Sequence, residues 1–302
     1  MLNKIRIILE MIKFEHTIFA LPFAFTAALL AAHGLPPWRT IILIIVAMVG
    51  ARSAAMGFNR WADRKIDAQN PRTKNRALPL GLVSPVQVML FTIISSFLLV
   101  IAAYMLNPLA FALSPLALGI VFLYSYTKRF TFLSHVVLGI AISGAPLGAW
   151  IAVSGAIDLP AVVLAIAVVF WLTGFDTLYA LQDREFDKKA GLHSIPQRFG
   201  VKRALWIARA SHAITMTALF ALGAMLHLGW LYLAGVDFDK VGFDTTMSND
   251  PILSNVKDFL GVVPMVLTIW PALFTGFHLL ATKNKNHGDH ENGHSEQEVH
   301  KP

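Results

Sequence analysis

The stretch Asn59-Arg60-Trp61-Ala62-Asp63-Arg64-Lys65-Ile66-Asp67 follows directly on an apolar run, residues 41–58, which predicts a membrane-spanning helix. Asn59, Asp63 and Asp67 are spaced four apart, so on a helix their side chains lie along one face. Two carboxylates and an amide are hard oxygen ligands, which suit Mg²⁺ better than a soft metal. A carboxylate at mid-bilayer costs about 2.5–3.5 kcal/mol on insertion scales. A bound divalent cation is the simplest compensation, so the stretch predicts a Mg²⁺ site at a helix end.

A second acidic stretch, residues 174–187, has the same character. Asp176, Asp183 and Asp187 are spaced seven and four, and the sequence predicts that they share one helical face. Asp183 and Asp187 are therefore candidate metal ligands, with a solvated helix end as the alternative. Asp176 lies inside an apolar run, where an unpaired carboxylate is costly, so we expect it to have a partner or a function.

Basic residues follow the first acidic stretch in the loop 70–81. Two prolines and a glycine in this loop argue against a continuous helix. Arg72, Lys74 and Arg76 would stand beside the Mg²⁺ site, where they would neutralise a diphosphate from the side opposite the metal. The alternative for each is ordinary loop charge on the cytoplasmic side of a membrane protein.

Three further polar residues near the apolar runs are candidates for the same site. Tyr124 and Lys128, four apart at a helix end, suit either an aromatic belt with a charged anchor or further diphosphate contacts. Arg52 lies one heptad before Asn59, deep in the span, and should face the bundle interior. It would either pair with a carboxylate such as Asp176 or hold the anionic end of a substrate.

The composition is that of a polytopic membrane protein. The 302 residues are 56% hydrophobic and only 14% charged. The net charge of +7 comes mostly from short loops between apolar runs, which indicates cytoplasmic membrane loops rather than nucleic-acid binding. The absence of cysteine excludes disulfides, thiolate metal sites and cysteine nucleophiles.

Apolar runs cover residues 17–33, 41–60, 84–106, 108–127, 133–154, 160–182, 203–230 and 259–282. Each is long enough, or nearly so, to cross a bilayer core of roughly 30 Å. Basic residues gather in alternate loops, which predicts eight spans with both termini and both acidic stretches in the cytoplasm; the stretch 203–258 leaves a ninth helix open. We therefore expect one transmembrane domain over 1–282, with a polar non-cytoplasmic loop at 237–258, and a disordered His-rich tail over 283–302.

Together these motifs resemble the UbiA superfamily of intramembrane prenyltransferases. Asn59-Arg60-x-x-Asp63-x-x-x-Asp67 resembles the first aspartate-rich motif of that family, and Asp183-x-x-x-Asp187 resembles the second. Residues 176–183, 124–129 and 194–196 are similar to the 4-hydroxybenzoate polyprenyltransferase branch. Residues 13–19 are closer to a branch associated with naphthoate prenylation in menaquinone synthesis, so the resemblance leaves the aromatic acceptor open.

The resemblance implies an all-α bundle of eight to nine transmembrane helices around a central cavity. It also implies Mg²⁺-dependent transfer of a polyprenyl group from an allylic diphosphate to a small aromatic acid, in ubiquinone or menaquinone biosynthesis. The acid would be 4-hydroxybenzoate or, alternatively, a dihydroxynaphthoate. The implied metal ligands are Asn59, Asp63, Asp67, Asp183 and Asp187, the diphosphate contacts are Arg72, Lys74, Arg76, Tyr124 and Lys128, and the catalytic residues at the acceptor are Asp176 and Arg52.

The same resemblance implies an enzyme of the bacterial inner membrane, surrounded by lipid, with its active site toward the cytoplasm; it leaves the oligomeric state open. Two other classes of protein are weaker explanations. A Mg²⁺ or organic-anion transporter usually has its site near the midplane and often has broken helices, whereas here both motifs gather at one face. A CDP-alcohol phosphotransferase would carry a glycine-containing acidic signature that this sequence lacks.

Overall fold

The computed structural model describes residues 7–8, 10–12 and 21–226, and all regular secondary structure among them is helical. The helices are α2 (Leu21–Ala32), α3 (Trp38–Gln69), α4 (Pro85–Leu106), α5 (Pro108–Thr127), α6 (Ser134–Ser154), α7 (Leu159–Tyr179), the 3₁₀ helix η2 (Ala180–Asp183), α8 (Arg184–Lys189) and α9 (Ile195–Met225). The expected loop 237–258, apolar run 259–282 and tail 283–302 lie outside the described residues.

Six helical stretches in this part of the chain are long and apolar enough to cross a membrane. They are α3, α4, α5, α6, the run from α7 to α8, and α9. Helix α2 is apolar but has only 12 residues. These stretches confirm the all-helical membrane fold expected from the sequence. Helix α9 begins at Ile195, where Ser194 caps its first turn through the N–H of Gln197. The backbone is kinked at Gly200, so the regular part of the helix starts just after it, close to the expected residue 203.

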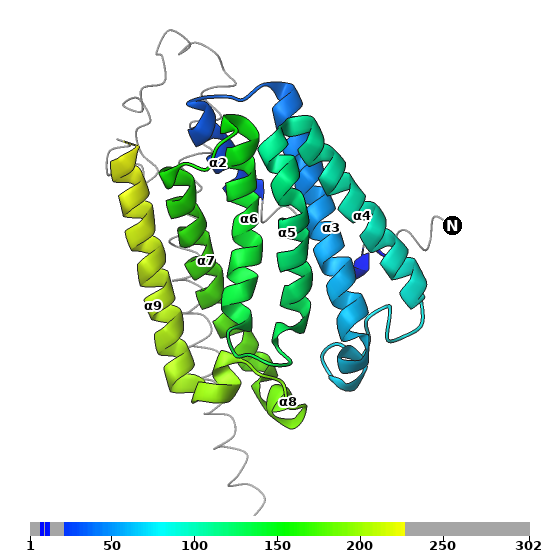
Figure 1. Cartoon of the computed structure of the whole chain (residues 1–302). Helices are drawn as coiled ribbons and strands as arrows, with labels where there is room; N and C mark the ends of the chain where they lie inside the picture. Colours follow the sequence, from blue (N-terminus) through cyan, green and yellow to red (C-terminus); the bar gives the residue numbers. More distant parts are fainter. Residues whose placement is uncertain (1–6, 9, 13–20, 227–302) are drawn as a thin grey trace, which may run out of the picture.

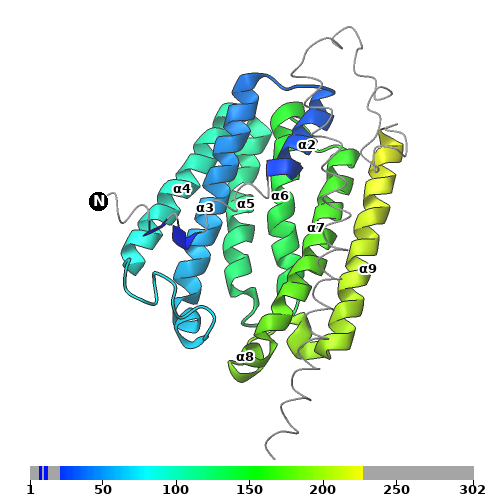
Figure 2. The same cartoon turned by 180° about the vertical axis from the view of Figure 1, so that it is seen from behind.

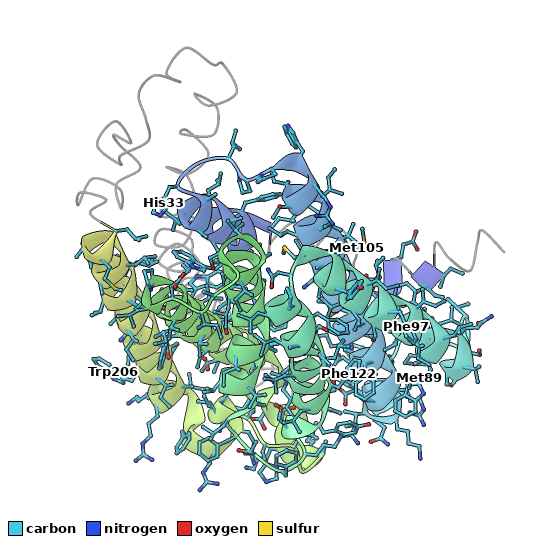
Figure 3. All side chains as sticks on the ribbon, turned by 45° about the horizontal axis from the view of Figure 1, so that its top comes forward. His33, Met89, Phe97, Met105, Phe122 and Trp206 are labelled. Atoms are coloured by element: carbon cyan, nitrogen blue, oxygen red, sulfur yellow. The ribbon has the colours of Figure 1, made fainter. Side chains whose placement is uncertain are left out.

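The spanning helices stand side by side in the order α4, α3, α5, α6, α7, α9, with each contacting the next (Figures 1 and 2). Small residues allow this close packing. A Cβ at Gly50 of α3 would stand 2.7 Å from the backbone nitrogen of Leu99 on α4, so only glycine fits at that crossing. Trp206 on α9 and Phe97 on α4 instead point away from the bundle, 68% and 61% exposed (Figure 3). Large apolar side chains on the outer surface suit a lipid environment.

The two acidic stretches lie at the same end of the bundle, the lower end in Figures 1 and 2. The first lies on one continuous helix, α3, as the spacing predicts. The prediction for the second was wrong in one respect, because Asp176, Asp183 and Asp187 do not share one regular helix. Helix α7 ends at Tyr179, and the 3₁₀ turn that follows has about three residues per turn, so the register changes before α8.

Candidate active site

The loop after α3 is fixed to the helix that carries the first acidic stretch. Asn70 ends α3, and its side-chain oxygen accepts the N–H of Arg72 at 2.9 Å. The hydroxyl of Thr73 donates to the carbonyl of Asp67 at 3.0 Å. Farther along, Leu78 and Val83 are buried against the start of α4. These contacts hold the start of the loop against the end of α3, and so they set the position of the first basic residue of the loop, Arg72.

Arg72 joins the two acidic stretches, because it extends from the loop to the second one. Its Nε and Nη2 donate to Asp183 Oδ1 and Oδ2 at 2.9 and 2.6 Å, a bidentate ion pair. The guanidinium also donates to the hydroxyl of Tyr179 and lies 5.6 Å from the centre of its ring. The hydrogen bonds from Arg72 to Asp183 raise the pKa of Arg72, so the guanidinium stays charged.

A second cation of the loop, Arg76, pairs with Asp67, the buried carboxylate of α3. Its Nη1 lies 2.7 Å from both oxygens of Asp67. Arg60, buried two helical turns earlier on α3, lies 3.9 Å from the same carboxylate. Two guanidinium groups therefore surround Asp67, which is consistent with a buried carboxylate in an apolar bundle.

Asp63 lies between an amide and a third arginine. The side-chain amide of Asn59 donates to Asp63 Oδ2 at 3.2 Å, as the spacing of four on a helix allows. Arg129, from the connection between α5 and α6, donates to Asp63 Oδ1 at 3.1 Å and to the carbonyl of Ala62 at 2.8 Å. The amide of Asn59 also lies 3.5 Å from the hydroxyl of Ser125, which ties α3 to α5.

The end of α5 contributes two polar side chains near this group, Tyr124 and the C-cap residue Lys128. Lys128 interacts electrostatically with Asp63, Asp176 and Asp187, which come from both acidic stretches. Tyr124 interacts electrostatically with Asp63 and Asp176. The carbonyl of Lys128 accepts the N–H of His193 at 2.7 Å, which fixes the loop after α8 against the end of α5.

Asp176 has a partner that the sequence analysis did not identify. Its Oδ2 lies 2.7 Å from Nδ1 of His135, one residue into α6. Close packing of α6 on α7 brings the two together: a Cβ at Gly139 would stand 3.1 Å from the hydroxyl of Thr173. The suggested pairing of Asp176 with Arg52 is therefore replaced by a pairing with His135. Arg52 is partly buried, and its Nε has no hydrogen-bond partner among the described residues.

The oxygen ligands at this end of the bundle suit a hard divalent cation in kind. Asp187 is buried, and its Oδ2 has no hydrogen-bond partner within the described residues, as expected of a ligand atom. In this arrangement no three acidic or histidine side chains of the described chain enclose a metal position. Arginines already pair with Asp63, Asp67 and Asp183, so those guanidinium groups must move aside before the same oxygens bind a metal.

The structure thus gathers most of the predicted site residues. Lys74 is an exception, because it has no ion pair or hydrogen bond among the described residues, whereas Arg72 and Arg76 pair with Asp183 and Asp67. Arg52 is another, since no ion pair or hydrogen bond within the described chain joins it to the group. Sequence reasoning missed the contacts of Arg60, Arg129 and His135. A histidine inside an apolar run was the available signal for His135, since a buried imidazole needs polar partners.

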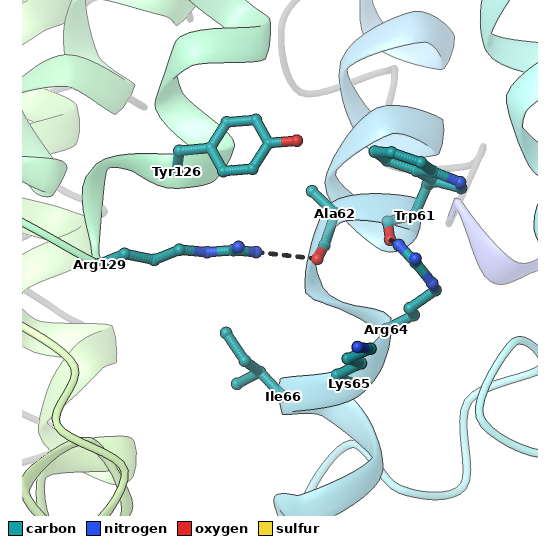
Figure 4. Close-up of a pocket in the computed structure, with 7 residues that line it drawn as sticks. All are labelled: Trp61, Ala62, Arg64, Lys65, Ile66, Tyr126 and Arg129. Atoms are coloured by element: carbon teal, nitrogen blue, oxygen red, sulfur yellow. Dashed lines mark hydrogen bonds between the residues drawn. The ribbon is translucent and has the colours of Figure 1, made fainter.

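A crevice of about 360 Å³ lies between α3 and the end of α5, next to Asp63 (Figure 4). Its lining is basic and aromatic, with no acidic side chain among the residues that form it: Trp61, Ala62, Arg64, Lys65, Ile66, Tyr126 and Arg129. Arg129 lies at its edge and also contacts Asp63. The crevice is therefore a neighbour of the carboxylate group rather than its centre.

Comparison with known proteins places this geometry in a family. The model of the UbiA prenyltransferase family matches residues 20–238. A 4-hydroxybenzoate octaprenyltransferase of Marinomonas sp. (strain MWYL1) is 36% identical over 78% of this chain and 84% of its own length. The enzyme of the same name from Vibrio atlanticus (strain LGP32) is 39% identical over 67% of this chain and 70% of its own length.

Solved structures agree. The apo structure of a UbiA homologue from Aeropyrum pernix K1 matches with a TM-score of 0.70 and 33% identity, over 86% of this chain and 98% of that one. A UbiA homologue from Archaeoglobus fulgidus, bound to GPP and Mg²⁺, matches with a TM-score of 0.59 and 20% identity, over 88% of this chain and 98% of that one. The chain belongs to the UbiA prenyltransferase family.

Proposed function

We propose that this prenyltransferase uses Mg²⁺ to transfer a polyprenyl group from an allylic diphosphate to an aromatic acid, with 4-hydroxybenzoate as the first candidate acceptor. The observation that carries the proposal is the ion pair between Arg72 and Asp183, which links the basic loop after the first acidic stretch to the second stretch at one end of the bundle. The names of the relatives support the acceptor, and the Archaeoglobus homologue with GPP and Mg²⁺ supports the donor and the metal.

In this proposal the carboxylates bind the metal and the cations bind the diphosphate. The metal ligands are Asn59, Asp63, Asp67, Asp183 and Asp187, and bound Mg²⁺ supplies stabilisation of the charge on the leaving diphosphate. Arg72 and Arg76 leave their carboxylates for phosphate oxygens, which accept the same planar fork of donors. Lys128 and Tyr124 contact the diphosphate from α5. Lys74 is a weaker candidate, because its side chain is exposed.

The reaction breaks the bond between the allylic carbon and the diphosphate oxygen, and the electron pair leaves with the diphosphate. The ring carbon beside the hydroxyl of the acceptor then forms a bond to the allylic cation and loses its proton. Asp176 orients the acceptor and accepts that proton, while Arg52 binds the carboxylate of the acid. Apolar surroundings protect the cation from water. The central cavity for the prenyl chain remains a prediction.

We further propose that the site faces the cytoplasm at a bacterial inner membrane, because the basic loops lie at the same end as both acidic stretches. Ubiquinone synthesis follows if the acceptor is 4-hydroxybenzoate. Residues 13–19, which resemble the naphthoate-prenylating branch, favour a dihydroxynaphthoate as the second candidate, with menaquinone as the product pathway.

The test is a product assay. Purified protein is supplied with Mg²⁺, geranyl diphosphate and, in separate reactions, 4-hydroxybenzoate and dihydroxynaphthoate isomers, and the products are identified by mass. We expect one acid to gain a geranyl group in a reaction that EDTA stops. A protein that prenylates none of these acids would contradict the proposed function.

A further inference from the structure

His135 has a role that neither the sequence motifs nor the family comparison assigns. We propose that it is a positioning residue, which fixes the orientation of the Asp176 carboxylate so that its remaining oxygen receives the aromatic acceptor. The inference rests on the proposed function, in which Asp176 faces that acceptor. It concerns the acceptor alone, because the residues that we assign to the metal and the diphosphate do not include His135.

The hydrogen bonds of His135 determine where its proton lies. The backbone N–H of Ile195 donates to Nε2 at 3.3 Å, and Nδ1 lies 2.7 Å from Asp176 Oδ2. A backbone N–H can only donate, so Nε2 must be the unprotonated nitrogen of a neutral ring. The proton is therefore on Nδ1, which donates to the carboxylate. The start of α9 thus selects the tautomer that Asp176 requires.

The packing leaves His135 no freedom to turn. Its side chain is 0% exposed, whereas that of Asp176 remains 20% exposed. The hydroxyl of Thr173 on α7 lies 3.5 Å from the carbonyl of His135, and the close approach at Gly139 is one helical turn away. Oδ2 of Asp176 consequently accepts a hydrogen bond from the fixed ring of His135, while part of the Asp176 side chain is still exposed to a ligand.

The surroundings of Asp176 also favour a positioning role for His135 over a purely structural role. Asp176 interacts electrostatically with Tyr124 and Lys128 on α5, the helix that borders the first acidic stretch. A rotation of the carboxylate would therefore change what it presents to the acceptor, whereas Asp63 and Asp183 keep their own arginine partners. If His135 only filled space, its loss would lower stability and weaken both substrates alike. A positioning role predicts a loss confined to the acceptor.

Two substitutions separate these roles. In His135→Asn the shorter side chain keeps an amide at the place of Nδ1, where it can still donate to Asp176. In His135→Gln the amide reaches the place of Nε2, where it can accept from Ile195 but cannot donate to the carboxylate. His212→Asn is the matched control, because His212 is a partly buried histidine on α9 that contacts α7 near Gly174 instead of Asp176.

The experiment uses the full chain in lipid nanodiscs with Mg²⁺, geranyl diphosphate and the acid that the wild type prenylates. We expect His135→Gln to lower kcat/KM for the acid by about 10–100-fold, the usual effect of losing an orienting partner, with the Kd for geranyl diphosphate unchanged. His135→Asn and His212→Asn should stay near the wild-type value. Equal losses in His135→Asn and His135→Gln, or a parallel loss of diphosphate affinity, would overturn the proposal.

A second measurement needs no activity. In ¹⁵N spectra of histidine-labelled protein, assigned by difference from His135→Asn, His135 should show a protonated Nδ1 and an unprotonated Nε2. An active wild type with the opposite tautomer, or with a doubly protonated ring, would overturn this inference alone. A wild type that prenylates no aromatic acid would instead remove the proposed function and the acceptor role with it, even where the expected tautomer is present.

Discussion

Asp176 on α7 and Asp183 in the 3₁₀ helix that follows are only seven residues apart, yet the structure holds their carboxylates in different ways. Asp176 is paired with His135, whose side chain is 0% exposed, whereas Asp183 is paired with Arg72, whose side chain is 37% exposed on a loop. A buried imidazole cannot leave its partner, but a guanidinium on a loop can move from a carboxylate to a phosphate. With the roles proposed above, in which Asp176 faces the acceptor and Asp183 the metal, the comparison teaches that the acceptor side would be preformed, while the diphosphate side would have to rearrange.

The largest effect should come from removing a carboxylate on the side that rearranges. We expect Asp63→Ala and Asp183→Ala each to lower radiolabelled prenyl transfer in membranes by about 10²–10³-fold, because the charge on the leaving diphosphate loses its stabilisation. Asp158→Asn is the control, since Asp158 lies at the opposite end of α7 and accepts from Trp150, a contact that asparagine keeps. Wild-type rates in both alanine variants would end this mechanism.

An effect of intermediate size should follow from replacing the guanidinium of Arg72 with a group of the same charge but another shape. Arg72→Lys loses the bidentate fork, and hydrogen bonds to charged groups are worth about 1.5–3 kcal/mol, so we expect geranyl diphosphate to bind about 10–100-fold more weakly. Lys74→Ala should have a much smaller effect, because that side chain is exposed. Titration calorimetry with Mg²⁺ measures both. Equal losses would show that charge in the loop matters more than the geometry of Arg72.

The smallest effect should come from the packing that preforms the acceptor side. In Gly139→Ala the new Cβ would clash with the backbone carbonyl of Val169 on α7 and stand 3.1 Å from the hydroxyl of Thr173, so we expect a loss of about 1–3 kcal/mol in stability and a lower Tm. Gly144→Ala, on the same helix, places its Cβ in open space among the described residues and should leave the Tm unchanged or slightly higher. If the two variants melt alike, the close approach of α6 and α7 does not fix His135.

The sequence predicted the first half of the site better than the second. Asn59, Asp63 and Asp67 lie on one face of α3 because a regular helix turns the spacing directly into geometry. The same argument misplaced Asp183 relative to Asp176, since nothing in the spacing indicates the 3₁₀ turn at Ala180–Asp183.

Contacts between residues that are far apart in the sequence could not be predicted for a related reason. Arg72 and Asp183 were both predicted site residues, but their pairing joins positions 111 residues apart. His135 and Asp176 are 41 residues apart and meet only because two helices pack closely at a glycine. Periodicity describes one element at a time, so it identifies residues of a face but not the side chain that meets it from another helix.

The most direct test of the account is the affinity of the purified protein for geranyl diphosphate with Mg²⁺ and with EDTA, measured by titration calorimetry for the wild type and for Asp183→Ala. We expect strong binding only in the wild type with Mg²⁺, because the carboxylates would hold the metal and the metal would supply positive charge to the diphosphate. The same Kd in EDTA as in Mg²⁺, or a Mg²⁺ effect that survives in Asp183→Ala, would contradict the claim that these carboxylates converge on a metal-bound diphosphate.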